Sequence, residues 1–197
     1  ALGECWKGAA KGAKNSVMVT LGTGVGGGMV ISGKVLPGVH GASGEIGHIK
    51  ISDTETEVCN CGNVGCLEQF TSATGIVRMT KKELKEGDLP SLLREKEDIT
   101  AKDVLDAAKA GDKLAEKILE DTGDKLGKAL SYISCVCDPE VFVIGGGVSK
   151  AGEILRASIE AGFQKYAFHA CKETKIVFAM LGNDAGIYGS VKLLLNE

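Results

Sequence analysis

Three cysteines, Cys59, Cys61 and Cys66, lie close together in a polar stretch that is punctuated by glycines. Thiolates are soft donors that suit Zn²⁺ in a closed tetrahedral site, and glycines let a short loop fold back on one ion. His48 is the nearest credible fourth ligand. The alternative is three reduced cysteines, which packing in a loop hardly justifies. The pattern therefore predicts structural zinc in the loop 48–68, although its spacing differs from zinc-finger and zinc-ribbon motifs.

A glycine-rich turn at residues 22–28 could hold an anion. It contains the G-x-G-x-x-G pattern after a strand-like run, but residues 29–31 read as a strand where a dinucleotide-binding fold requires a helix. The Gly-Lys-Ser/Thr of a Walker P-loop is absent. What remains is a glycine hairpin whose N–H groups face an anion, with the Thr20 and Thr23 hydroxyls as further donors, or a tight β-turn without a ligand.

Gly145, Gly146 and Gly147 form a second glycine turn, between a buried strand-like run and the start of a helix. A flat or anionic ligand could approach the backbone closely there. Close packing of the strand against the helix explains the same glycines equally well, and the residues alone leave both interpretations open.

Two carboxylates flank the cysteine loop. Glu45 lies three residues before His48, and Glu68 lies two residues after Cys66. If His48 and Cys66 bind one metal, Glu68 is drawn toward it. A ligating histidine usually hydrogen-bonds through its second ring nitrogen, and carboxylates accept from vicinal hydroxyls, so this set suits a sugar. The alternative is that both acids are solvated loop residues.

The composition fits one folded domain that positions these groups. Of 197 residues, 44% are apolar, and 28 glycines with only 3 prolines exclude collagen-like and Pro/Gly-rich disordered chains. A net charge of −3 does not indicate binding to nucleic acid, which requires an excess of basic residues. No apolar run approaches the ~20 residues that are needed to cross a membrane. The 7 cysteines suit a reducing cytoplasm. Those outside the loop are expected to be buried as small hydrophobic residues: Cys5, Cys135, Cys137 and Cys171.

Apolar patterning predicts antiparallel strands followed by strand–helix units, and hence an α/β fold with a mixed sheet flanked by helices. Strands are expected at 17–21, 29–31, 46–51, 141–144 and 176–181, with a hairpin turn at 32–34. Helices are expected at 1–10, 67–80, 100–110 and 112–135, and after the caps Ser149 and Asn183 or Asp184. The charged stretch 81–98 is expected to be a surface excursion within the helical segment 81–110. The helix 112–135 has one apolar face: Leu114, Ile118, Leu126, Ala129, Leu130 and Ile133.

Together these segments resemble the ROK family of repressors and sugar kinases, and most closely its bacterial glucokinases. The resemblance covers nearly the whole chain apart from 81–98. Its most specific part is the pair E-x-G-H and C-x-C-G-x2-G-C-x-E. The matching stretches are residues 20–28, 41–48, 59–68, 143–148 and 181–186.

The resemblance implies the two-lobed actin-like ATPase (ribonuclease H-like) fold, of which residues 1–197 would form the second, C-terminal lobe. Glu45, His48 and Glu68 would bind the sugar hydroxyls, and His48 with the three loop cysteines would bind zinc. The ATP-facing residues would be Thr20, Gly22, Thr23, Gly24, Gly26, Gly145, Gly146 and Gly147. The implied activity is phosphorylation of glucose by ATP with Mg²⁺, in the cytoplasm, by a homo-oligomer such as a dimer.

The chain departs from the family in its first part. The aspartate-glycine phosphate motif and the catalytic Asn-Asp pair of the first lobe are absent, and the chain opens with Ala1 within a helix-like stretch. The catalytic aspartate, which accepts the sugar hydroxyl proton, is expected just before Ala1. No catalytic residue is therefore predicted in this chain, which is expected to be inactive alone.

Three functions remain open. The first is the second lobe of a glucokinase or of a kinase for another hexose, such as N-acetylmannosamine or fructose. The second is the sugar-sensing lobe of a ROK repressor, and the third is a zinc-stabilised fragment without activity of its own. The complete phosphate-facing turn favours the kinase. Because the last helix of the family packs on the first lobe, an exposed apolar patch, or its burial in a dimer, is expected here: Val191, Leu193, Leu194 and Leu195.

Overall fold

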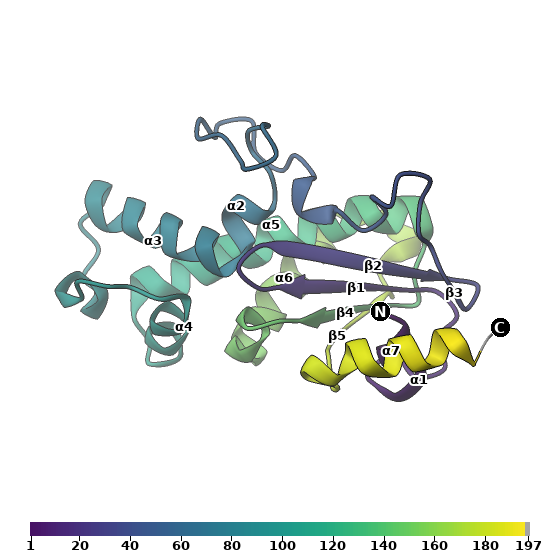
Figure 1. Ribbon diagram of the computed structural model, residues 1–197. Coiled ribbons are helices and arrows are strands. Elements are labelled where there is room, and N and C mark those ends of the chain that lie inside the picture. The colour runs from purple at the N-terminus through teal and green to yellow at the C-terminus, as the bar shows by residue number, and fades with distance from the viewer. Residues whose placement is uncertain (196–197) are drawn as a thin grey trace.

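A five-stranded sheet forms the centre of the computed structural model, which describes residues 1–195 (Figure 1). Its strands are β1 (Ser16–Leu21), β2 (Val25–Ile31), β3 (Lys34–Val35), β4 (Val141–Gly145) and β5 (Lys175–Phe178). They lie side by side in the order β3-β2-β1-β4-β5. β1 pairs antiparallel with β2 and parallel with β4, which in turn pairs parallel with β5. The predicted mixed sheet is therefore present.

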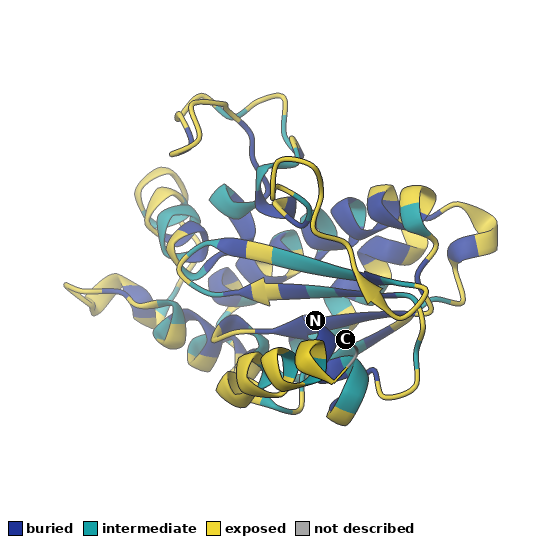
Figure 2. Ribbon diagram, turned by 45° about the vertical axis from the view of Figure 1, so that its right-hand side comes forward, coloured by how far each residue is buried: buried dark blue, intermediate teal, exposed yellow. Residues whose placement is uncertain are grey.

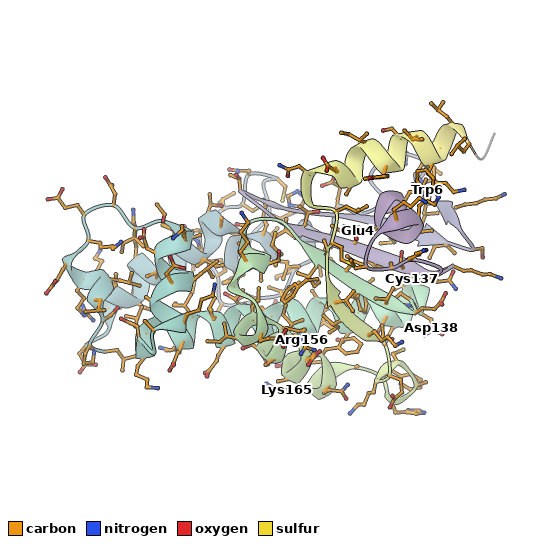
Figure 3. All side chains as sticks on the ribbon, turned by 90° about the horizontal axis from the view of Figure 1, so that it is seen from below. Glu4, Trp6, Cys137, Asp138, Arg156 and Lys165 are labelled. Atoms are coloured by element: carbon orange, nitrogen blue, oxygen red, sulfur yellow. The ribbon has the colours of Figure 1, made fainter. Side chains whose placement is uncertain are left out.

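Helices cover both faces of this sheet (Figure 1). The α-helices are α1 (Leu2–Lys7), α2 (Glu68–Thr71), α3 (Ala73–Glu86), α4 (Ala101–Lys109), α5 (Lys113–Cys137), α6 (Glu153–Tyr166) and α7 (Ala185–Leu194). Short 3₁₀ turns are η1 (Ile46–His48), η2 (Leu92–Glu95), η3 (Val148–Ala151), η4 (His169–Cys171) and η5 (Gly182–Asp184). α5 and α6 pack on one face, α1 and α7 lie on the other, and α3 and α4 extend past the strands (Figures 1 and 3). None of the helices described in residues 1–195 is long and apolar enough to cross a membrane.

Alternate residues of the central strands point to opposite faces of the sheet and supply two parts of the core. Val17, Val19 and Leu21 belong to the large buried cluster on the side of α5 and α6. Met18 and Val143 belong to a smaller cluster, which packs against the segment that follows α1. This two-sided burial explains why the runs around them are almost continuously apolar in sequence.

The long helix α5 confirms the predicted apolar face, because all six residues of that face are buried. Its contact with α6 also depends on residues without side chains. A Cβ atom at Gly127 would lie 2.3 Å from the backbone nitrogen of Phe163, and one at Gly123 would lie 2.3 Å from the Cβ of Ser158. The two helix backbones therefore approach each other more closely than alanine would allow.

Glu4 joins the two ends of the described chain (Figure 3). Its fully buried carboxylate accepts hydrogen bonds from the backbone nitrogens of Ala9 at 2.7 Å and Leu181 at 2.8 Å. It also accepts from the nitrogen of Met180, at 3.1 Å and 3.2 Å for its two oxygens. These bonds turn the chain away from the sheet, so β5 ends at Phe178 and not at residue 181 as predicted.

Helix α7 is largely exposed (Figure 2) and carries the exposed apolar patch that the sequence predicted. The four predicted residues are all exposed: Val191, Leu193, Leu194 and Leu195. Ile187 and Tyr188 on the same helix are exposed as well, and Trp6 of α1 packs edge-on against the Tyr188 ring. α7 is thus held to the molecule through α1 while much of its apolar surface faces outward.

The predicted strand at 46–51 is wrong. Residues Ile46–His48 form the 3₁₀ turn η1, and only Lys50 makes a single bridge, to Cys66. The reason lies at Gly47, where a Cβ would stand 2.3 Å from the carbonyl oxygen of Val25. The chain there packs against the first residue of β2 and does not pair with β2 as a strand.

The helix predicted at 67–80 is divided in two. Ser72 has an extended backbone and caps α3 by accepting a hydrogen bond from the nitrogen of Gly75. α3 then continues to Glu86, so the predicted excursion begins later than residue 81. Within it, Leu93 is buried against the core, so this segment is not purely a surface loop.

Of the predicted helix starts, the one at Asp184 is confirmed and the one at Ser149 is wrong. Ser149 lies inside η3 and donates its hydroxyl to the oxygen of Gly146, whereas α6 begins after Gly152, which has a φ of +75°. Asp184 stands at the N-cap of α7 but makes no side-chain capping bond. Both helices therefore start from 3₁₀ turns, which the cap pattern did not reveal.

The cysteines outside the loop are less uniform than predicted. Cys171 is buried, Cys5 and Cys137 are half-buried, and Cys135 is exposed. Cys135 lies on the outer side of α5, two residues after the buried Ile133, which accounts for its exposure.

Candidate functional site

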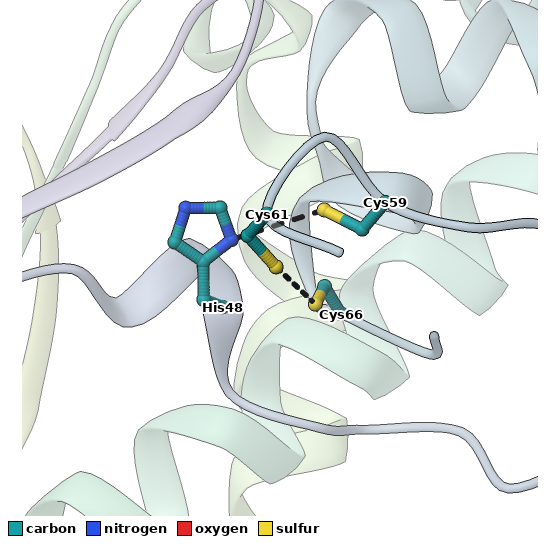
Figure 4. Close-up of side chains that lie close together, drawn as sticks. All are labelled: His48, Cys59, Cys61 and Cys66. Atoms are coloured by element: carbon teal, nitrogen blue, oxygen red, sulfur yellow. Dashed lines mark hydrogen bonds between the residues drawn. The ribbon is translucent and has the colours of Figure 1, made fainter. Parts of the chain in front are cut away.

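The structure brings together the four residues predicted to bind a metal (Figure 4). The ligand atoms of His48, Cys59, Cys61 and Cys66 all lie within 4.8 Å of one another. The Sγ atoms of Cys61 and Cys66 are 3.6 Å apart, and Cys59 Sγ is 3.8 Å from His48 Nδ1. Ligand atoms around a tetrahedral zinc stand about 3.8 Å apart, given Zn–S bonds of about 2.3 Å. The donor set and its spacing therefore fit zinc.

A small hairpin at residues 58–65, called the metal hairpin below, presents two of these cysteines. Val58 and Val64 form an antiparallel bridge, and between them the nitrogen of Cys59 donates to the oxygen of Asn63 at 2.7 Å. Gly62 closes the turn with a φ of +89°, a backbone conformation that residues with a side chain rarely adopt. His48 arrives from η1, and Cys66 follows the hairpin directly.

The surroundings of the three thiols shift their pKa values in different directions. The Asn63 backbone N–H lowers the pKa of Cys61 to about 7, whereas burial and the neighbouring thiols raise the pKa of Cys66 to about 12. Burial also raises the pKa of Cys59. Three crowded thiols resist full deprotonation unless a cation is present, so metal binding here would release protons.

Glu68 lies between the metal cluster and the glycine turn. Its Oε1 atom is 3.2 Å from Cys59 Sγ and 3.9 Å from His48 Nδ1. Its Oε2 atom accepts a long hydrogen bond, 3.4 Å, from the nitrogen of Val25. A Cβ at Gly24 would stand 2.8 Å from the same oxygen, so that glycine keeps the turn open to the carboxylate.

Glu45 completes the predicted sugar-binding set from the opposite side of the imidazole. Its Oε2 atom is 3.9 Å from His48 Nε2, which is too long for a direct hydrogen bond. The Glu45 side chain is 62% exposed and that of His48 is 34% exposed, while Glu68 is 19% exposed. The two carboxylates thus lie 3.9 Å from different nitrogens of one imidazole.

The predicted phosphate-facing turn connects β1 and β2. The nitrogen of Gly22 donates to the oxygen of Gly24 at 3.0 Å, which makes the turn tight, and Thr20, Thr23 and Gly26 are exposed beside it. The turn is a β-hairpin and leads into a strand, as predicted. It therefore differs from a dinucleotide-binding turn, which leads into a helix.

The second glycine turn lies next to the first. Gly145 ends β4 and pairs with Thr20 of the parallel strand β1, so both turns leave the same edge of the sheet. A Cβ at Gly146 would lie 2.3 Å from the oxygen of Leu21, which shows how closely the turns approach. Gly146 and Gly147 are exposed. The two predicted glycine turns are thus brought together at the same end of β1 and β4.

Two hollows adjoin this region. One, of about 320 Å³, lies between the glycine turn, the metal hairpin and the start of α3, and includes Thr23, Glu68 and Arg78. The other, of about 440 Å³, is lined by the second glycine turn at Gly147 and by the apolar side of α4 at Leu105. The glycine turns therefore open onto concave surface.

Several residues that support the site were not identified from the sequence. The nitrogen of Ala73 donates to the oxygen of Gly22 at 2.8 Å, and the Thr74 hydroxyl donates to the oxygen of Thr23 at 2.6 Å. Arg78 pairs with Glu55 and reaches the Gln69 carbonyl. The signal that could have indicated them is the Ser72 cap, which sets the start of α3 against the turn.

Comparison with known proteins places these features in a family. The ROK family model matches residues 1–197. A glucokinase of Halalkalibacterium halodurans is 46% identical over 193 residues, which cover 96% of this chain and 58% of that protein. The chain therefore spans less than two thirds of this relative.

Solved structures of both kinase and regulator type have the same fold. A ROK family transcriptional regulator, a homolog of the E. coli MLC protein, matches with a TM-score of 0.87 and 33% identity over 96% of this chain and 48% of its own. A ROK family glucokinase from Streptomyces griseus, in complex with glucose and AMPPNP, matches with a TM-score of 0.86 and 31% identity over 98% of this chain and 64% of its own. The predicted actin-like fold class is confirmed.

Proposed function

The chain belongs to the ROK family, and from that premise we propose that it is the C-terminal lobe of a sugar kinase which transfers phosphate from ATP to glucose. In this proposal the chain binds the sugar and structural zinc and supplies part of the ATP site. The observation that best supports this proposal is the position of Glu68. One of its carboxylate oxygens lies against the metal cluster and the other lies against the glycine turn. A sugar bound there lies beside the turn that faces the phosphates.

The sugar would bind through Glu45, His48 and Glu68. The gap of 3.9 Å between Glu45 Oε2 and His48 Nε2 is suited to a hydroxyl that hydrogen-bonds to both groups. Ligation through Nδ1 would fix the imidazole and leave Nε2 for the sugar. Carboxylates that accept from neighbouring hydroxyls give charge-assisted bonds and hence selectivity for a polyol.

Zinc would be held by His48, Cys59, Cys61 and Cys66, where its role is to cross-link η1 to the hairpin. The contribution of a structural zinc is folding free energy and not reaction chemistry. Its loss would free both His48 and the hairpin beside Glu68. The sugar-binding residues therefore depend on the metal for their positions.

ATP would lie along the two glycine turns, with its phosphates at residues 22–26 and its adenosine near residues 145–147. Backbone N–H groups of such turns can hydrogen-bond phosphate oxygens without a side chain in the way. When bound, Mg²⁺ would neutralise charge on the phosphates. The base that accepts the sugar proton would come from the preceding lobe, so we expect residues 1–197 alone not to phosphorylate glucose.

Two measurements on the purified chain test this proposal. Glucose binding is measured by titration calorimetry, with N-acetylmannosamine and fructose compared under the same conditions. Phosphorylation is measured with a coupled assay for ADP. We expect glucose to bind best and no turnover above background. Turnover by the chain alone, or no binding of any of the sugars, would overturn the proposal.

The second candidate is the sugar-sensing lobe of a ROK repressor. The match to the transcriptional regulator structure, with a TM-score of 0.87, favours it. A repressor lobe has no need of the complete phosphate-facing turn, which favours the kinase. Binding of a nonhydrolysable ATP analogue to the chain in the presence of glucose separates the two, because only the kinase requires it. In either case we propose a cytoplasmic homodimer.

A further inference from the structure

The side chain of Gln69 lies across the open end of the metal hairpin. Its Oε1 atom accepts hydrogen bonds from the nitrogens of Gly65 at 2.9 Å and Cys66 at 3.0 Å. Its Nε2 atom donates to the carbonyl oxygen of Glu57 at 2.9 Å. One amide therefore joins both arms of the hairpin, just outside the bridge between Val58 and Val64.

This arrangement replaces one rung of a β-ladder by a side chain. At the next position outward from that bridge, residues 57 and 65 stand opposite each other, but the Gln69 amide lies between them. A primary amide can donate and accept as a peptide group does, so it satisfies backbone groups on both sides. The two arms are thereby connected through the Gln69 side chain at this position.

The position of Gln69 is itself fixed from two sides. It is the second residue of α2, directly after Glu68, and its carbonyl oxygen accepts a hydrogen bond from Arg78 Nη2 at 3.0 Å. Arg78 also pairs with Glu55 at 2.7 Å and with Glu57 at 3.1 Å, on the arm that leads into the hairpin. The Gln69 side chain thus connects the hairpin to a supported helix.

We propose that Gln69 is the positioning residue of the metal centre, which holds the Cys59–Cys61 arm and the Cys66 arm at ligating distance before the metal binds. Gln69 does not itself ligate, since its polar atoms are engaged with backbone groups. Preorganisation lowers the cost of ordering the loop when zinc binds. The proposal deepens the assigned zinc role of the proposed function and rests on it only for the metal readout.

The test uses two variants of the full chain. Gln69→Met keeps the length of the side chain but removes all three hydrogen bonds. Gln69→Glu keeps the acceptor for Gly65 and Cys66 and removes the donor to Glu57. The matched control is Gln164→Met, on α6. It removes one exposed hydrogen bond, from the Gln164 side-chain amide to the backbone oxygen of Lys172. Circular dichroism of each variant verifies the fold.

The first readout is zinc affinity, measured by competition with a chromophoric chelator. Loss of an outer-shell partner typically weakens metal binding about 10- to 100-fold, so Gln69→Met should fall in that range and Gln164→Met should match the unchanged chain. Equal zinc affinity for Gln69→Met and the unchanged chain would overturn the proposal.

The second readout needs no metal. Amide hydrogen exchange of the metal-free, reduced chain is followed by NMR at Gly65 and Cys66. Both amides should exchange faster in Gln69→Met and stay protected in Gln69→Glu. If the unchanged chain binds no zinc, the zinc role fails, but this comparison still decides whether Gln69 holds the hairpin. If the exchange rates of these two amides are unchanged in Gln69→Met, Gln69 does not hold the hairpin.

Discussion

The Glu68 carboxylate lies 3.2 Å from the Cys59 thiol, and its second oxygen faces the amide of Val25 at the glycine turn. One side chain thus touches the cysteine hairpin of the candidate metal site and the glycine turn at residues 22–28, although the sequence separates these segments by more than thirty residues. Because Glu68 begins α2, two residues after Cys66, we expect a metal bound at the cluster to influence where its carboxylate points.

Replacement of Glu68 by glutamine should weaken glucose binding. Glutamine keeps the shape of the side chain but loses the charge, and hydrogen bonds to charged groups contribute about 1.5–3 kcal/mol each. We expect a loss of about tenfold or more in affinity, measured by titration calorimetry. Glu97→Gln, an exposed substitution before α4, is the control and should bind as the unchanged chain does. An unaltered affinity in Glu68→Gln would remove Glu68 from the sugar site.

The pair of Glu55 and Arg78 should make the stability of the chain depend on acid pH. The Arg78 guanidinium lowers the pKa of Glu55 from 4.5 to about 2, and the Glu55 side chain is only 5% exposed. A lowered pKa in the folded state stabilises the protein above the unfolded pKa, and this contribution is lost as the pH falls from about 4.5 toward 2. Its size at pH 7 should be about 1–3 kcal/mol.

Urea unfolding of the metal-free, reduced chain measures this contribution, because zinc release then plays no part. The difference in unfolding free energy between the unchanged chain and Glu55→Gln should be largest near pH 7 and shrink between pH 4.5 and 2. A difference that is constant with pH would show that the Glu55 charge does not stabilise the fold.

Removal of the Thr74 hydroxyl should loosen the phosphate-facing turn. Thr74→Val keeps the shape of the side chain and leaves the Thr23 carbonyl without its donor at 2.6 Å. We expect several-fold weaker binding of an ATP analogue, with glucose affinity nearly unchanged, whereas Thr74→Ser should retain the nucleotide affinity. Equal effects of valine substitution on both ligands would instead indicate general unfolding of the site.

Alanine at Gly127 should destabilise the whole fold. Its Cβ would lie 2.3 Å from the Phe163 nitrogen, so α6 must move away from α5. Overpacking of this kind costs about 1–3 kcal/mol. Gly186→Ala is the control, because it lies in α7 with open space around it and should stabilise the helix by up to about 1 kcal/mol. Thermal unfolding of both variants provides the comparison.

The sequence predicted the parts of this molecule that depend on local pattern. The apolar face of α5 and the hairpin between β1 and β2 follow from periodicity and glycine placement, and both are present. The cysteine spacing predicted which residues converge, since a short loop can bring its sulfurs together. Local pattern therefore sufficed for these two elements and for the convergence of the four side chains.

Other features depend on contacts between distant segments, which local pattern does not contain. The stretch after Gly44 has the apolar residues of a strand, yet Gly47 packs on Val25 and the chain makes a 3₁₀ turn. β5 ends early because Glu4, at the other end of the chain, binds the amides that follow it. Gln69 carries no motif of its own, and its role appears only where the hairpin arms meet.

In the proposed function, the metal positions the sugar-binding residues. The most direct test of this role is the glucose dissociation constant of the chain, measured by calorimetry first with one zinc bound and then after removal of zinc by a chelator under reducing conditions. We predict that removal weakens glucose binding at least tenfold and that added zinc restores it. The same affinity with and without zinc would contradict the account.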